Sequence, residues 1–142
     1  MAINFAGANT SPYNNDKDVH VRVFKLTSAN FTVTTATETL LGVLPADSTI
    51  LSFNYWNKTK LAGGSVSAAT LSLGTASAGT EFVETFDVFT TVGTQAILSP
   101  VTGIMQPYAV PQGGDIQIWA SGLATTGTPT SGEIYVTVTY VR

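Results

Sequence analysis

The sequence contains no cysteine, and this absence removes several kinds of chemistry at once. Without thiols the chain can form no disulfide bond, no thiolate nucleophile and no cysteine-ligated metal site. The missing cysteines do not identify a cellular compartment.

Charged residues are scarce as well. They make up 11% of the chain, against about a quarter in ordinary globular proteins. Thr, Ser, Ala and Gly supply the surface instead, and such a surface costs little to desolvate against another protein. The net charge is −3 and the six Lys and Arg residues are scattered, whereas nucleic-acid binding needs a basic patch. We therefore expect no nucleic-acid partner.

Long apolar runs are missing too. No stretch approaches the roughly 20 residues of a membrane-spanning helix, and the first residues (MAINF) show neither a basic nor an apolar signal region. We expect no membrane partner and no secretory signal, so the Asn-x-Thr sequences at Asn30 and Asn57 are interpreted as unglycosylated polar surface. A hydrophobic content of 44% over 142 residues still suffices for one domain with a real core.

What the chain does have is period-two alternation of apolar and polar residues between Gly- and Pro-rich turns. In the first strand Val19, Val21 and Val23 are expected to face inward, with His20 on the opposite face. Residues 122–132 are interpreted as a loop, and some eight strands at this spacing predict an all-β sandwich. The clearest strands are residues 19–26, 31–35, 39–44, 49–56, 69–74, 115–120 and 133–142.

Residues 80–89 are ambiguous between helix and strand. Phe82, Phe86 and Phe89 recur at helical spacing, and Thr80 could cap the first turn. Residues 88–92, in contrast, have a β-like composition. We expect a short helical turn near residues 81–86, and at most one or two such helical segments in the whole chain.

Residues 1–18 lack any period, so we expect them to form an extended N-terminal arm and residues 19–142 to form the sandwich domain. Isolated apolar side chains in the arm, Ile3, Phe5 and Tyr13, could fill pockets on a partner. Pro12 would limit the unbound conformations of the arm. The alternative is a frayed terminus.

A catalytic set is not visible. His20 is expected to be an exposed or partly packed strand residue rather than a general base. Glu81, Glu84 and Asp87 crowd on one short element, where solvation is the better interpretation, and residues 14–18 lack the Gly and Glu of an EF-hand. We expect no enzyme, no metal and no cofactor.

Aromatic residues have two possible roles. Trp56, Tyr108 and Trp119 are candidate contacts between subunits, and core burial is the alternative for each. Together with Tyr55, they could also form a sugar-stacking platform.

Three blocks resemble small virion proteins of tailed bacteriophages: residues 44–51 (LPADSTIL), 69–75 (ATLSLGT) and 82–88 (FVETFDV). The closing residues 132–138 (GEIYVTV) are similar to the final strand of the same proteins. From about residue 40 to residue 142 the chain thus resembles head-decoration, or capsid-cement, proteins of jelly-roll type. The resemblance implies a jelly roll that forms a homotrimer on the capsid surface, braces neighbouring major capsid proteins and catalyses nothing.

The weakly charged surface fits a structural subunit that is made in the host cytoplasm and ends in the virion. The same features fit a tail-fibre or receptor-binding virion module, and also a lectin-like carbohydrate-binding β-sandwich. Pattern alone leaves the choice between a jelly roll and another sandwich topology open.

Overall fold

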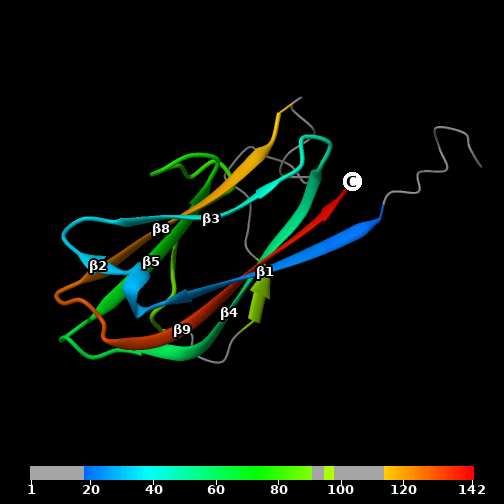
Figure 1. Cartoon of the computed structure of the whole chain (residues 1–142). Coiled ribbons are helices and arrows are strands. Elements are labelled where there is room, and N and C mark those ends of the chain that lie inside the picture. The colour runs from blue at the N-terminus through cyan, green and yellow to red at the C-terminus, as the bar shows by residue number, and fades with distance from the viewer. Residues whose placement is uncertain (1–17, 91–94, 98–113) are drawn as a thin grey trace, which may run out of the picture.

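The computed structural model describes residues 18–90, 95–97 and 114–142, and shows two β-sheets packed face to face (Figure 1). The expected all-β sandwich is confirmed, with one 3-10 turn, η1 (Ser28–Asn30). The described strands are β1 (Val19–Thr27), β2 (Thr32–Val33), β3 (Thr37–Leu44), β4 (Thr49–Ala62), β5 (Ala68–Gly74), β6 (Val83–Asp87), β7 (Gln95–Ile97), β8 (Ile116–Thr125) and β9 (Ser131–Val141).

The strand order settles the topology. The first sheet runs β1-β9-β4-β7, and the second runs β2-β8-β5-β6, with β3 also beside β8. The antiparallel pairs are nested: β1 with β9, β3 with β8, β4 with β7, and β5 with β6. The chain is therefore one long hairpin rolled over two sheets, which is the jelly-roll arrangement.

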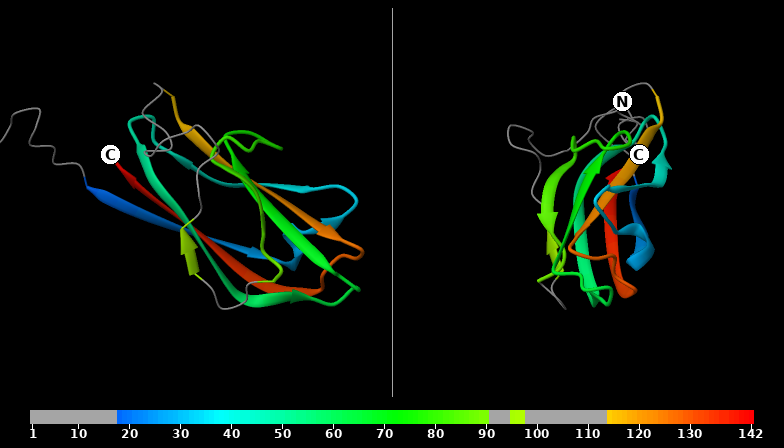
Figure 2. Two further views of the ribbon diagram at one scale, coloured as in Figure 1. Left: turned by 180° about the vertical axis from the view of Figure 1, so that it is seen from behind. Right: turned by 90° about the vertical axis from the view of Figure 1, so that its left-hand side faces the viewer.

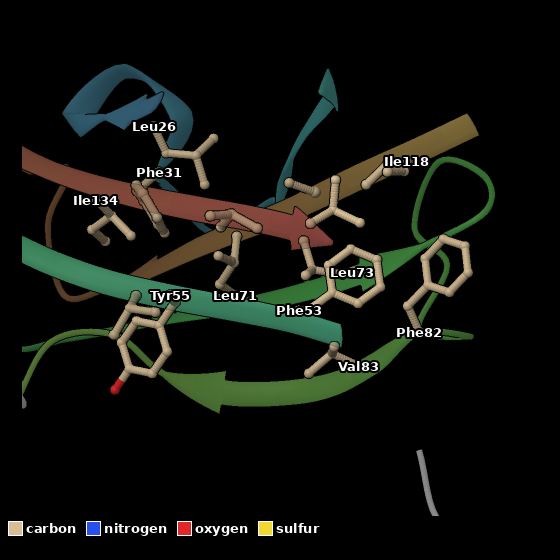
Figure 3. Packing of buried hydrophobic residues seen from close by; sticks show 14 of the residues in the cluster. Leu26, Phe31, Phe53, Tyr55, Leu71, Leu73, Phe82, Val83, Ile118 and Ile134 are labelled. Atoms are coloured by element: carbon tan, nitrogen blue, oxygen red, sulfur yellow. The ribbon is translucent and has the colours of Figure 1, made fainter. Parts of the chain in front are cut away.

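Between the sheets lies a continuous apolar core (Figure 3). Ile134, Val136 and Val138 of β9 are fully buried, as the alternation of that strand predicts. Leu71 and Leu73 of β5 face them from the second sheet, also as predicted. Each such side chain contributes about 1.5–3 kcal/mol on burial, so the two central inward faces account for much of the driving force for folding.

The predicted phase of β1 is wrong. Val19, Val21 and Val23 point outward and are 63%, 59% and 60% exposed. Phe24 and Leu26, which lie opposite Val136 and Ile134 of β9, face the core instead. Successive strand residues alternate between faces, so burying the larger Phe24 and Leu26 forces the three valines into solvent.

The helical turn predicted near residues 81–86 is also wrong, because this segment forms β6. Leu71 pairs with Phe86, and Leu73 pairs with Val83 across a register shift. The Phe82 ring packs 5.2 Å from that of Phe53, and the Phe86 ring packs 5.2 Å from that of Tyr55. Strand pairing and ring packing across the sandwich override the helical spacing of the phenylalanines.

Asn57 is fully buried, whereas the sequence predicts it on the polar surface. β4 continues beyond residue 56 to Ala62, and its alternation carries Asn57 to the inward face opposite Ile134. There the side-chain Nδ2 donates to the carbonyl oxygen of Val88 at 2.6 Å. Asn57 therefore ties the first sheet to the segment that follows β6.

β1 and β8 begin, and β9 ends, at one end of the sandwich. Val19 and Thr49 both pair with Val141, and Ile116 pairs with Leu44. The turn that follows β3 is closed by the Ser48 amide donating to the Pro45 carbonyl at 2.9 Å, as its sequence predicts.

At the opposite end the β4–β5 and β8–β9 loops pack backbone against backbone. β8 extends through Thr125, so the β8–β9 loop is shorter than the predicted span of 122–132. Gly64 has φ +56°, and a Cβ there would collide with the carbonyl oxygen of Thr128. A Cβ on Gly127 would likewise collide with the carbonyl oxygen of Gly64. This end therefore requires glycine where the two loops meet.

We expect Gly64→Ala to lower the free energy of unfolding by about 2 kcal/mol or more, because the new methyl group meets backbone at a positive φ. Gly114→Ala is the matched control, since a Cβ at Gly114 meets nothing within 4 Å; it should change stability by less than about 0.5 kcal/mol. Urea unfolding of both variants measures the difference. Equal effects at the two positions would contradict the tight loop packing.

Candidate functional site

Trp56 lies on the outward face of the first sheet, so it is a surface residue and not part of the core. Its ring stacks on Tyr135 of β9, with centroids 5.7 Å apart and planes 23° apart. Lys58 Nζ lies 5.7 Å from the centroid of the Tyr135 ring. Trp56 is half-buried by these neighbours. One face of the Trp56 ring is therefore covered by Tyr135.

Trp119 lies on the opposite outward face, that of the second sheet. It is half-buried, and its Nε1 donates to Gln117 Oε1 at 2.8 Å. Leu40 of β3 pairs with it directly. The structure therefore does not bring Trp56 and Trp119 together, and Tyr55, at 8% exposure, belongs to the core. One sugar-stacking platform cannot be built from these three residues within one chain.

The other sequence-predicted contact residues lie outside the described part of the chain. These are Tyr108 and the arm residues Ile3, Phe5, Pro12 and Tyr13.

Sequence reasoning missed a row of apolar residues on β1, here called the valine stripe: Val19, Val21 and Val23. Their cross-strand neighbours in β9 are Val141, Thr139 and Thr137. The β9 residues beside the stripe are therefore uncharged. The signal that could have revealed the stripe is Phe24 with Leu26, because a buried even-numbered face implies an exposed odd-numbered one.

A second group of exposed apolar residues, the leucine patch, lies along the outward face of β3 and β8 and consists of Leu40, Val43 and Leu123; Leu40 is beside Trp119, and Leu123 is beside Thr32 and Thr70. These side chains are 44%, 37% and 36% exposed. Their register with β8 places Leu40 opposite Trp119 and Val43 opposite Gln117, across a bulge in β3. The two apolar groups contain six of the seven large apolar residues that are exposed in the described part of the chain; the seventh is Val33.

One charged cluster lies at an end of the outward face of the first sheet. Glu133 receives a hydrogen bond from the Tyr135 hydroxyl. Its Oε1 also lies 3.2 Å from Lys25 Nζ and 3.4 Å from Lys58 Nζ. The hydrogen bonds from Tyr135 and Lys25 lower the pKa of Glu133 from 4.5 to about 2, and the one with Glu133 raises the pKa of Tyr135. The single carboxylate of Glu133 thus interacts with two ammonium groups, which leaves the cluster with one net positive charge.

Glu81 and Asp87, two of the carboxylates considered as catalytic candidates, instead accept hydrogen bonds from nearby loop residues. Glu81 Oε2 accepts the Thr75 amide at 2.9 Å, and this bond lowers the pKa of Glu81. Burial alone would raise the pKa of Asp87, but hydrogen bonds from the Thr90 hydroxyl and from the amides of Phe89 and Thr90 outweigh it and lower the pKa. Each of these two carboxylates has a local structural role.

His20 packs against an aromatic ring. Its imidazole stacks on Tyr140 with centroids 5.2 Å apart, in agreement with the partly packed strand residue that the sequence predicts. Within residues 18–90, 95–97 and 114–142, no group of three or more His, Cys, Asp or Glu residues could hold a metal ion. The same residues include no helix long and apolar enough to cross a membrane.

No protein-family model and no curated protein matches the chain. Among solved structures, a chain of the cyanophage Pam1 capsid asymmetric unit superposes with a TM-score of 0.61 at 20% identity, over 88% of this chain and 85% of that one. A chain of the capsid of Ralstonia phage GP4 superposes with a TM-score of 0.56 at 16% identity, over 88% and 84%. At these identities the comparisons establish a shared fold.

The Glu133 cluster should make stability depend on acid pH. The folded pKa lies below the unfolded value of 4.5, so the ionised cluster stabilises the fold above that value. This contribution should fade as pH falls from 4.5 towards 2. We expect Glu133→Gln to be less stable than the parent chain at pH 7, and the difference to shrink over that acid range in urea unfolding. A difference that stays constant down to about pH 2 would contradict the lowered pKa.

Proposed function

We propose that this chain is a bacteriophage virion protein that decorates the capsid surface and stabilises it by bridging major capsid protein subunits. The observation that carries the proposal is the structural likeness, over 88% of this chain, to chains from two phage capsids. The match covers most of this chain and a similar share of each neighbour, so the neighbours are proteins of about the same size. A small, separate capsid component accounts for that size.

The outward faces support a role in protein–protein contact. Between the Glu133 cluster and the Arg142–Asp47 ion pair, the first sheet presents Val, Thr, Ser and Asn. Burying such a face avoids the cost of desolvating unpaired charges. Its half-buried aromatic residues, Trp56 and Tyr135, are of the types that anchor interfaces.

Residues 1–18 are the proposed docking arm of this protein. β1 begins at Val19, so the arm attaches where β9 ends. An extended segment can add to the edge of a partner's sheet, with Ile3, Phe5 and Tyr13 filling pockets. Each anchor would contribute about 1.5–3 kcal/mol, against ordering costs of about 1–2 kcal/mol per residue. Three arms on one homotrimer would restore the affinity through effective concentration.

Virion composition tests the proposed role directly. We expect quantitative mass spectrometry of purified particles to find this chain in numbers that scale with the major capsid protein, and electron microscopy to place it on the outer shell. Only a few copies, located at the tail, would favour the tail-fibre or receptor-binding alternative. Absence from the particle, combined with glycan binding in an array, would favour the carbohydrate-binding alternative.

Deletion of residues 1–18 tests the arm. The truncated chain should remain a folded oligomer, because the core contacts begin after residue 18, and it should no longer stay on particles that have been stripped of the native protein. A matched control is the full-length chain in which Ile3, Phe5 and Tyr13 are replaced by Ser, which keeps the length and removes the anchors. Binding of the truncated chain as tight as that of the full-length chain would mean that residues 1–18 do not dock.

A further inference from the structure

We infer that the outward face of the first sheet docks an acidic segment of the major capsid protein through the ammonium groups of Lys25 and Lys58. The occupant of this surface is then a protein segment that carries an aspartate or glutamate side chain. The inference deepens the proposed function and rests on it, because the partner is the protein that this chain is proposed to bridge.

The two strands that flank β9 bring a cationic and an aromatic side chain to the same place. Lys25 of β1 and Trp56 of β4 both pair with Tyr135 of β9, so the three residues form one row across the sheet. The Trp56 and Tyr135 rings are stacked. A partner that contacts this row meets a positive charge beside an aromatic pair, and aromatic side chains are among those that most often anchor interfaces.

A β-bulge in β4 adds the second lysine. Asn57 pairs with Ile134 and Thr59 pairs with Glu133, so Lys58 is the extra residue between two paired ones. β-bulges re-aim side chains and are over-represented beside functional sites. Here Lys58 Nζ lies 3.4 Å from Glu133 Oε1. The bulge thus places a second ammonium group next to the single carboxylate.

The cluster presents its positive charges to solvent and keeps its negative charge more covered. The side chains of Lys25 and Lys58 are 52% and 45% exposed, whereas that of Glu133 is 22% exposed. Both ammonium groups approach the same oxygen, Glu133 Oε1, so the two positive charges lie close together and repel each other. A carboxylate from a partner would balance the remaining charge and form charge-assisted hydrogen bonds with the lysines.

Glu133 also restricts the two lysine side chains before a partner arrives. Fixing a lysine costs rotamer freedom, and this cost counts against binding. Within the chain, Lys25 and Lys58 are both paired with Glu133, and Lys58 Nζ also lies 5.7 Å from the centroid of the Tyr135 ring. Part of the ordering cost is therefore met in the free protein, which favours docking of a second carboxylate.

The distribution of charge along the sandwich directs an acidic partner to this place. The chain has a net charge of −3, and Asp18, Asp47 and Asp115 lie at the end where β1 and β8 begin. Arg142 pairs with Asp47 there. The Glu133 cluster lies toward the opposite end of β1 and β9, which Figure 2 shows side by side along the sandwich. Complementarity of charge at one end only fixes the orientation of the partner.

The position of the cluster also fits a bridging role. The proposed arm attaches where β1 begins, and the cluster lies near the other end of the same strand. At a rise of about 3.3 Å per residue, Val19 and Lys25 are roughly 20 Å apart. Contacts separated in this way can engage two capsid subunits, which a single contact could not do.

Carbodiimide coupling tests the contact directly, because this reagent joins an amine to a carboxylate that it touches and leaves no spacer. We expect mass spectrometry of treated particles to find Lys25 or Lys58 linked to an aspartate or glutamate of the major capsid protein. Links from the same lysines to Glu133 show that the reagent reaches the cluster. The absence of any link from Lys25 or Lys58 to the capsid protein would overturn the inference.

A variant with fewer charges provides an independent measurement. We expect Lys25→Gln/Lys58→Gln to bind stripped particles about tenfold more weakly than the parent chain at low salt, and the difference to shrink as added salt screens the charges. Lys60→Gln is the matched control, since Lys60 Nζ lies 4.4 Å from the centroid of the Phe89 ring instead of against Glu133. This control should bind as tightly as the parent chain.

The outcomes separate the inference from the proposed function. Binding of the double variant as tight as that of the parent chain would overturn the inference and leave the decoration role intact. Failure of the parent chain itself to bind stripped particles would remove the proposed function, and the inference with it. Release of the parent chain by a soluble anionic glycan, without links to the capsid protein, would assign the cluster to a glycan and overturn the inference.

Discussion

The register of β9 is the constraint on which the rest of the structure depends. This strand pairs with β1 along one side and with β4 along the other, so its inward residues set the phase of three strands. A slip of one residue would turn Ile134, Val136 and Val138 to solvent. The same alternation sends Tyr135 outward beneath Trp56 and places the valine stripe on the surface. Core and contact surface are thus two consequences of one pairing.

The parts of this fold that local pattern can predict are those in which alternation and side-chain size agree. In β9 and β5 every inward position is apolar, and the predicted faces are confirmed. In β1 both faces carry apolar residues. The face with Phe24 and Leu26 is the one that turns inward, because their greater volume fills the core. The phenylalanines at and beside β6 are a similar case. Their spacing along the chain predicts a helix, but the strand conformation is set by packing on Phe53 and Tyr55, which come from the other sheet.

The strand order could not be read from the sequence because it depends on pairs that are far apart in the chain. β1 and β9 are its first and last described strands, and no local signal indicates that they are neighbours. The role of Trp56 and Trp119 as contacts between subunits stays a prediction. Trp56 and Trp119 do lie on outward faces, but the valine stripe depends on the phase of β1, which only the packed structure reveals.

The pairing of β1 with β9 has a mechanical consequence. The hydrogen bonds of an antiparallel ladder lie perpendicular to the strands, so a pull on residue 18 along the axis of β1 loads all nine residue pairs together, in shear. A pull between residue 18 and Arg142 would instead open the same ladder one pair at a time, because both ends lie at one end of the sandwich. Tension that reaches the domain through its N-terminus and is resisted by its far loops therefore acts along the stronger direction.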